Sequence, residues 1–479
     1  MRKNLILAAV LAALAITAPG AETPAAGEPA AALDALSGIA AYEHCKALAA
    51  EPFAGRFTGT AEYGAAARWA AGKFQEWGLA APAGGFLQPF PAPHSLVDRA
   101  RMVVAAAGKE RELEAGKDFL PMLFSDSGQA SGPAVFAGWG ISAPELGYDD
   151  YAGVDVRGKF VVCFRGVPRP DDKRFQHHDE HRVRMQTARR QGALGLIYVY
   201  PEVQANPNGD RLEHFFPAEI SEAVADSLLE PRGVKAADLK KDLLAYRVPI
   251  SFPLDAHIGL EVEARHFPAA VGCNIAGYLP GSDPALAGEC IVLGAHFDGC
   301  GRHLGILFPG ADDNASGSAV VMEIARAMSA SGLRLRRPVV FVLFGGEEMG
   351  LLGSNHYAAH LSAPFRRVDA MFNLDMEGEG DRAYASFSAE PAALRRAIER
   401  ADARLRVLAG SREIREVGVR SSDFAPFFLQ GVPCAGFFAN GPHLAYHQAG
   451  DSILRINPDI LATVARLTLL SAWHWDGRP

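Results

Sequence analysis

Cysteine is scarce in this chain, with six residues in 479. Their wide and irregular spacing does not resemble a disulfide framework, and without any CxxC pair a thiolate zinc site is disfavoured. We therefore expect each cysteine to be a small buried apolar residue. The six are Cys45, Cys163, Cys273, Cys290, Cys300 and Cys434.

Runs of lysine or arginine are also missing. The formal net charge of −8 is mild and is spread along the chain, so no basic stripe points to nucleic acid. Hydrophobic residues make up 49% of the chain, which is enough for a large core and argues against global disorder. These features fit an enzyme or binding protein of roughly two to four domains.

Long apolar runs are absent too, apart from a short one near the start. Leu5–Ile16 follows Arg2 and Lys3 and is too short to span a bilayer comfortably, a pattern typical of a signal peptide, with a membrane anchor as the alternative. We expect residues 1–21 to be removed. The rest would be exported to the periplasm or the extracellular medium, without stable membrane insertion.

The remaining chain changes character along its length. Residues 119–255 contain short strand-like runs such as KFVVCFRG and LGLIYVYP between turn residues, which indicates a small β-rich domain. From about Ala269, strands and helices alternate, which predicts a mostly parallel sheet with helices on both faces. The strands are expected at Cys290–Phe297, Val339–Phe344, Ala370–Asp375 and Cys434–Ala439, and helices after Asn314 and Leu352 and at Ala392–Leu405 and Pro458–Trp475.

Acidic and imidazole side chains follow each of these strands. In open α/β sheets, ligands gather at the carboxyl ends of strands, so we expect these side chains to meet at one edge. Histidine with carboxylates suits a hydrolytic zinc site, and the number of carboxylates indicates two metal ions. The residues are His296, Asp298, Asp312, Asp313, Glu347, Glu348, Asp375, His443, His447 and Asp451.

Five motifs carry a family resemblance. HFD, DDNASG, GGEE, NLDM and YHQAGD, in this order, resemble the co-catalytic zinc aminopeptidases of peptidase family M28. Residues 119–255 resemble a protease-associated (PA) domain, inserted as in many members. The resemblance implies a phosphorylase/hydrolase-like α/β catalytic domain with a mixed, mostly parallel sheet, made of residues 22–118 and 256–479. It also implies two Zn²⁺ per chain and hydrolysis of N-terminal peptide bonds in peptides or proteins.

The resemblance assigns a role to each matching residue. Glu347 would be the general base toward a hydroxide held between two zinc ions, and Asp298 would orient His296. Adjacent residues on extended chain face different ways, so Glu348 can bind metal while Glu347 points at water. The implied ligands are His296 and Asp375 for one ion, Glu348 and His447 for the other, and Asp313 between them.

Several neighbouring residues have two readings. Asp312 supports its loop or caps the next helix, His443 is a loop residue or else a metal ligand, and Glu377 attracts a substrate amino group or faces solvent. Ser422 and Asp423 resemble the family's substrate-side loop, although a helix cap explains them equally well. Tyr446 is a candidate donor to an oxyanion, and Asp451 a brace for the His447 loop.

A rival metal cluster and rival functions also follow from the sequence. HHDEH, residues 177–181, has three imidazoles and two acids, but its charged flanks favour an exposed loop that enters a helix. The same di-zinc site would serve a carboxypeptidase or dipeptidase. A glutaminyl cyclase-like acyltransferase needs only one zinc ion, and a receptor-like binding protein should have lost ligands. The oligomeric state is left open.

Overall fold

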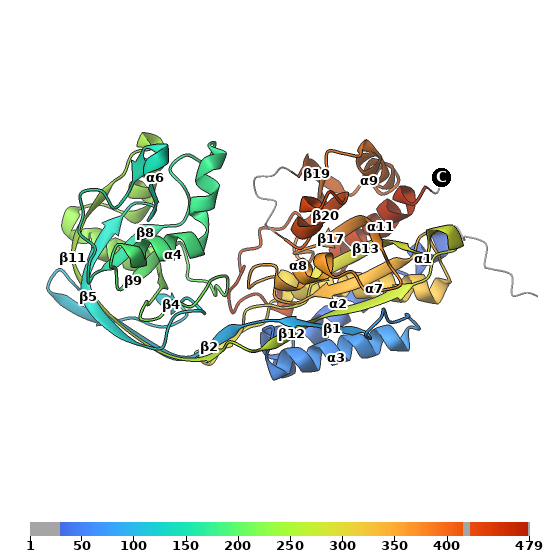
Figure 1. Ribbon diagram of the computed structural model, residues 1–479, viewed down its shortest axis with the longest axis horizontal. Helices are drawn as coiled ribbons and strands as arrows, with labels where there is room; N and C mark the ends of the chain where they lie inside the picture. Colours follow the sequence, from blue (N-terminus) through green and yellow to red (C-terminus); the bar gives the residue numbers. More distant parts are fainter. Residues whose placement is uncertain (1–28, 415–421, 478–479) are drawn as a thin grey trace, which may run out of the picture.

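The computed structural model describes residues 29–414 and 422–477, which form two lobes (Figure 1). The expected signal peptide, residues 1–21, lies outside the described residues. Among the helices of the described part, none is both long and apolar enough to cross a bilayer. Each lobe is built on one eight-stranded sheet.

The first sheet is mixed and mostly parallel, as the sequence predicts. Its four central strands run parallel to one another, whereas antiparallel pairs flank them at both sides. In spatial order the strands are β1 (Leu87–Pro91), β12 (Val271–Leu279), β16 (Val339–Phe344), β13 (Glu289–His296), β17 (Arg367–Leu374), β20 (Cys434–Ala439), β18 (Ala383–Phe387) and β19 (Leu408–Glu413).

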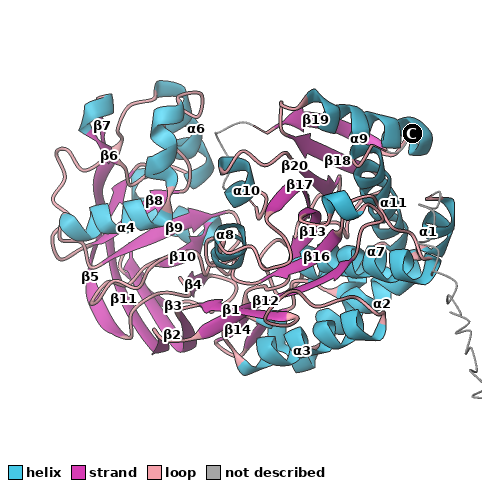
Figure 2. Cartoon of the chain, turned by 45° about the vertical axis from the view of Figure 1, so that its right-hand side comes forward, coloured by secondary structure: helices cyan, strands magenta, loops and turns pink. Residues whose placement is uncertain are grey.

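Helices cover both faces of this sheet (Figure 2). Successive strand residues point to opposite faces, so Leu293 and Phe341 join one apolar core, whereas Val292 and Val340 join another. The first core is shared with α1 (Ala30–Ala35), α2 (Gly38–Leu48), α3 (Ala61–Glu76), α7 (Gly317–Ser331), α9 (Ala392–Leu405) and α11 (Pro458–Trp475). The second core is shared with α8 (Leu352–Ala359) and α10 (Ala425–Leu429).

The second sheet is inserted between β1 and β12. It carries three helices, α4 (His181–Arg190), α5 (Glu222–Leu229) and α6 (Ala236–Tyr246). In spatial order its strands are β3 (Lys109–Glu112), β2 (His94–Ala106), β11 (Ser251–Phe267), β5 (Gly128–Ala137), β8 (Phe160–Phe164), β9 (Gly195–Tyr200), β10 (Ala218–Ser221) and β4 (Phe119–Pro121). Two-stranded ribbons are formed by β6 (Ser142–Ala143) with β7 (Tyr148–Asp149), and by β14 (Gly301–His303) with β15 (Ile306–Phe308).

Two long antiparallel strands, β2 and β11, connect the lobes. In the first sheet, the pairing of β1 with β12 ends where Pro91 lies opposite Val271. The pairing of β2 with β11 begins a few residues farther along, where His94 lies opposite Phe267. The strands of the second sheet thus run from His94 to Phe267. The domain division at residues 119 and 255, and the PA identity of this lobe, stay predictions.

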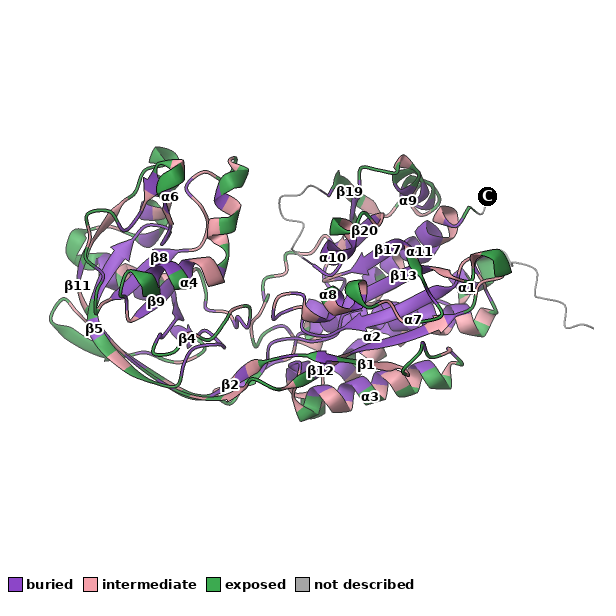
Figure 3. Ribbon diagram, in the orientation of Figure 1, coloured by how far each residue is buried: buried purple, intermediate pink, exposed green. Residues whose placement is uncertain are grey.

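The strands and helices that position the candidate site lie where the sequence predicts them. β16 and β20 have the expected bounds, and β13 and β17 differ by no more than a few residues at their ends. These central strands are almost fully buried (Figure 3). Five cysteines are buried, as expected, and Cys273 is partly exposed.

Candidate metal centre

The four adjacent parallel strands bring their carboxyl ends to one edge of the first sheet. His296 is the last residue of β13, Glu347 and Glu348 follow β16, and Asp375 follows β17. Asp313 lies in the irregular turn before α7, and His447 lies in the turn after β20. The structure therefore brings together all five residues to which the resemblance assigns metal binding.

Asp313 stands at the middle of this group. Its Oδ1 lies 3.0 Å from Nε2 of His296, and its Oδ2 lies 3.2 Å from Nε2 of His447. Although burial opposes the change, hydrogen bonds from the two imidazoles lower the pKa of the Asp313 carboxyl. One carboxylate thus faces two histidines, which is the arrangement that a bridging ligand needs.

A second carboxylate accompanies each histidine. Asp375 Oδ1 is 3.3 Å from His296 Nε2, and Glu348 Oε2 is 2.8 Å from His447 Nε2. Among the described residues, the potential ligand atoms of His296, Asp313 and Asp375 lie within 4.8 Å of one another. The site therefore has two halves that share Asp313.

Asp298 contacts His296 mainly through its backbone. His296 Nδ1 lies 3.2 Å from the Asp298 carbonyl oxygen, and the Asp298 carboxylate is more distant, at 3.9 Å. The carboxylate instead accepts the N–H of Glu347 at 3.2 Å. Asp298 thereby connects the end of β13 to the glutamate pair after β16.

Glu347 lies beside both halves of the site. Possible ligand atoms of Glu347, Glu348 and His296 lie within 4.8 Å of one another. Burial, reinforced by the charge of Glu348, raises the pKa of Glu347 well above its ordinary value, although His296 opposes the shift. A carboxyl with a raised pKa next to a charged ligand set is suited to proton transfer.

Asp312 and Asp451 hold the turn that carries Asp313. Asp451 accepts the backbone N–H groups of Asp312 and Asp313 at 2.7 and 3.0 Å. Asp312 accepts the Gly378 N–H and lies 2.5 Å from Nδ1 of His443. Asp451 therefore braces the Asp313 turn, and Asp312 connects that turn to the His443 loop.

Glu377, Ser422 and Asp423 surround Asp375. Glu377 is fully buried, so the reading in which it faces solvent is wrong; its Oε1 accepts the Asp375 N–H. Ser422 donates to Asp375 Oδ2 at 2.5 Å, and Asp423 is buried beside the site. Burial raises the pKa of Asp423 to about 7.

Residues 177–181 are not uniformly exposed. The His177 side chain is 70% exposed, but His181 is buried where α4 begins and contacts Asn206. The prediction of an exposed loop therefore holds for His177 and fails for His181. No potential metal group found among the described residues includes this tract.

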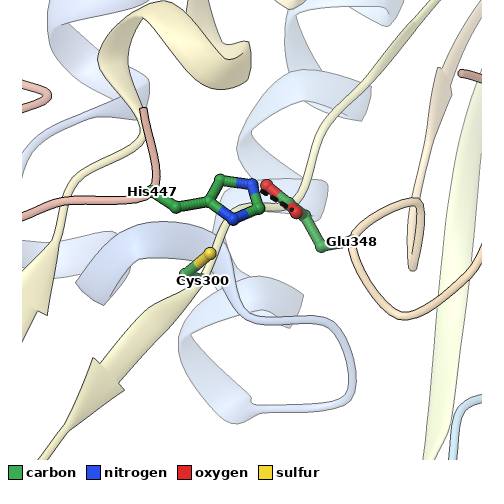
Figure 4. A group of neighbouring side chains, drawn as sticks. All are labelled: Cys300, Glu348 and His447. Atoms are coloured by element: carbon green, nitrogen blue, oxygen red, sulfur yellow. Dashed lines mark ion pairs between the residues drawn. The ribbon is translucent and has the colours of Figure 1, made fainter. Parts of the chain in front are cut away.

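Cys300 is buried, as expected, but it also lies beside the second half of the site, a placement that its sequence context did not predict. Its sulfur and ligand atoms of Glu348 and His447 lie within 4.8 Å of one another (Figure 4). Burial raises the pKa of this thiol to about 12. The only signal in the sequence was its position two residues after Asp298.

The donor set fits bound cations. Glu348 Oε1 and His447 Nε2 are buried without a hydrogen bond of normal geometry, although acidic oxygens lie close to that nitrogen. Six carboxylates surround only two imidazoles, so the cluster would repel itself without added positive charge. The six are Asp298, Asp313, Glu347, Glu348, Asp375 and Asp423.

The family model for peptidase family M28 matches residues 274–472, which include the whole cluster. This part of the chain is an M28 domain. The first sheet and the site described above belong mainly to that domain, and the inserted lobe lies before it in the sequence.

Proteins similar to this M28 domain include aminopeptidases. Leupeptin-inactivating enzyme 1 of Streptomyces exfoliatus is 29% identical over 43% of this chain and 48% of its own length. Aminopeptidase YwaD of Bacillus subtilis is 29% identical over 39% of this chain and 41% of its own. The chain thus spans less than half the length of either curated relative.

A solved structure resembles both lobes together. The structure of BSAP, a zinc aminopeptidase from Bacillus subtilis, superposes with a TM-score of 0.63 over 91% of this chain and 94% of that one, at 22% identity. At this identity the likeness establishes the shared fold. The M28 domain and its inserted lobe therefore have a precedent as one architecture.

Proposed function

We propose that this chain is an exported zinc-dependent aminopeptidase that hydrolyses N-terminal peptide bonds. The observation that carries the proposal is Asp313, whose two oxygens lie 3.0 and 3.2 Å from different histidines. The M28 domain, the similarity to an aminopeptidase, and the shared fold with a zinc aminopeptidase support it.

Two zinc ions would be held by this chain's own residues. His296 and Asp375 would bind one ion, Glu348 and His447 the other, and Asp313 both. Bound zinc would supply acidity to a water molecule near neutral pH and would polarise the scissile carbonyl.

Glu347 would move the proton in this reaction. It lies beside both halves of the site but is not needed as a ligand, and its pKa is raised. As a carboxylate it would take a proton from the attacking water, and as an acid it would return that proton to the leaving amine.

A pocket of about 610 Å³ would receive the N-terminal residue. It opens beside Asp375 and Ser422 and is lined by the rings of Phe424, Phe437 and Phe438. An apolar wall next to the reacting groups favours substrates with an apolar first residue.

The test is cleavage of a peptide library by the purified mature protein, followed by mass spectrometry. Free, N-terminally blocked and C-terminally amidated peptides are compared, with a chelated sample as control. Stepwise loss from free N-termini, abolished by blocking and by chelation, is expected. Loss from free C-termini alone would favour a carboxypeptidase, and N-terminal pyroglutamate formation without cleavage would favour a cyclase.

A further inference from the structure

His447 uses only one of its ring nitrogens toward the proposed metal position. Nε2 faces both Glu348 and Asp313, at 2.8 and 3.2 Å. Nδ1 is buried, and among the described residues it makes no hydrogen bond of normal geometry. Histidines that bind metal almost always donate this second N–H to an acceptor, which fixes the tautomer and the ring orientation.

The thiol of Cys300 is the polar group beside that nitrogen. The Cys300 sulfur lies within 4.8 Å of a ring nitrogen of His447. In Figure 4 the ring nitrogen joined to Glu348 faces away from Cys300, and the other ring nitrogen is drawn on the side of the sulfur.

The thiol hydrogen is directed elsewhere. Cys300 Sγ donates to the carbonyl oxygen of Ala205, at 3.7 Å. A thiol has one hydrogen and a weakly accepting sulfur, so this bond leaves the sulfur lone pairs free to accept from an N–H. Cys300 is only 3% exposed, which keeps water from competing for either position.

Ala205, a residue of the inserted lobe, hydrogen-bonds to both Cys300 and His447. Besides accepting from Cys300, Ala205 donates its own N–H to the carbonyl oxygen of His447 at 2.8 Å. His447 has a φ of 55°, a left-handed conformation that is uncommon for residues other than glycine and needs support from its surroundings.

We propose that Cys300 is a positioning residue for His447: its sulfur accepts the Nδ1–H, so that the lone pair of Nε2 points at the second zinc position. Ala205, from the inserted lobe, orients the thiol and supports the His447 backbone. The inference rests on the proposed function, because it requires that His447 bind a metal ion.

The experiment uses the full chain, with Cys300→Ala, Cys300→Ser and the control Cys290→Ala. Cys290 is a matched control because it is equally buried and its thiol also meets a backbone carbonyl at 3.7 Å, that of Arg367, near the opposite end of β13. Zinc affinity is measured by competition with a chromophoric chelator, and cobalt-loaded protein is examined by absorption spectroscopy.

We expect Cys300→Ala to lower the zinc affinity of one of the two sites by about 10–100-fold and to leave the affinity of the other site unchanged. The zinc affinity of Cys300→Ser, which keeps a hydrogen-bond acceptor, should lie between those of Cys300→Ala and the wild type. Cys290→Ala should bind both ions with wild-type affinity. The cobalt spectrum of the wild type should lack a sulfur-to-metal charge-transfer band.

Three results would overturn the positioning role. These are unchanged zinc affinities in Cys300→Ala, an equal loss in Cys290→Ala, or a charge-transfer band that disappears in Cys300→Ala and so marks the sulfur as a ligand. All three leave the proposed aminopeptidase intact, whereas a wild-type chain that binds no zinc would refute both.

Discussion

Glu347 and Glu348 are adjacent in sequence but contact different groups. Glu348 lies 2.8 Å from His447, at the proposed metal position. Glu347 is anchored through its backbone N–H by Asp298, and its side chain has a raised pKa. The same substitution at the two positions should therefore have different effects.

Glu347→Gln is expected to lower kcat by about 10²–10⁴-fold, because the amide cannot take a proton, and to keep both zinc ions. Glu348→Gln is the matched control and should lose zinc from one position. Peptide turnover and zinc content measured on the same samples check both expectations. A Glu347→Gln variant with normal turnover would remove Glu347 from the proton-transfer role.

At the scale of elements, β14 is attached to β2 through a histidine that must stay neutral. Val97 N–H donates to Nδ1 of His303 at 3.2 Å, and His303 is 1% exposed. Burial lowers the pKa of His303 to about 4. A charged imidazole could not accept this hydrogen bond, so protonation should loosen the ribbon of β14 and β15.

The pH dependence follows from the lowered pKa. Between pH 6.5 and 4 the unfolded chain binds a proton at His303 that the folded chain does not, so stability falls as the pH falls. At pH 5 this loss is on the order of 2 kcal/mol. Urea unfolding of wild type and His303→Asn at pH 7 and pH 5 checks it, and an equal loss in both proteins would contradict the assignment.

The elements that build the site were more predictable than those that connect the lobes. β13 and β16 are continuous apolar runs, because both of their faces are covered, and their ends carry proposed metal ligands. The length of β11 depends on pairing with β2, which lies far earlier in the chain. For the same reason the approach of Ala205 to Cys300 and His447 has no local sequence signal.

For the whole molecule, the metal centre should contribute to stability. Zinc that binds only the folded chain stabilises it by about 4 kcal/mol per site at roughly a thousandfold excess over Kd. We therefore expect chelation to lower the Tm by several degrees. Asp313→Ala removes the proposed ligand that both halves of the site share, so we expect the Tm of this variant to change little when chelator is added.

Calorimetry with and without chelator, on both proteins, measures this difference. A wild-type Tm that is insensitive to chelation would mean that the carboxylate cluster is stable without cations. A similar chelator response in Asp313→Ala would place the stabilising ions away from Asp313.

The way β2 and β11 leave the first sheet has a consequence for how such a chain can arise. The entry and exit of the second lobe are neighbours, since Pro91 pairs with Val271 and His94 with Phe267. Without residues 94–267, β1 and β12 would remain a β-hairpin that a short turn could close. The second lobe thus occupies the turn of a hairpin, where a gene segment can be gained or lost without changing the order of the strands that hold the proposed metal ligands.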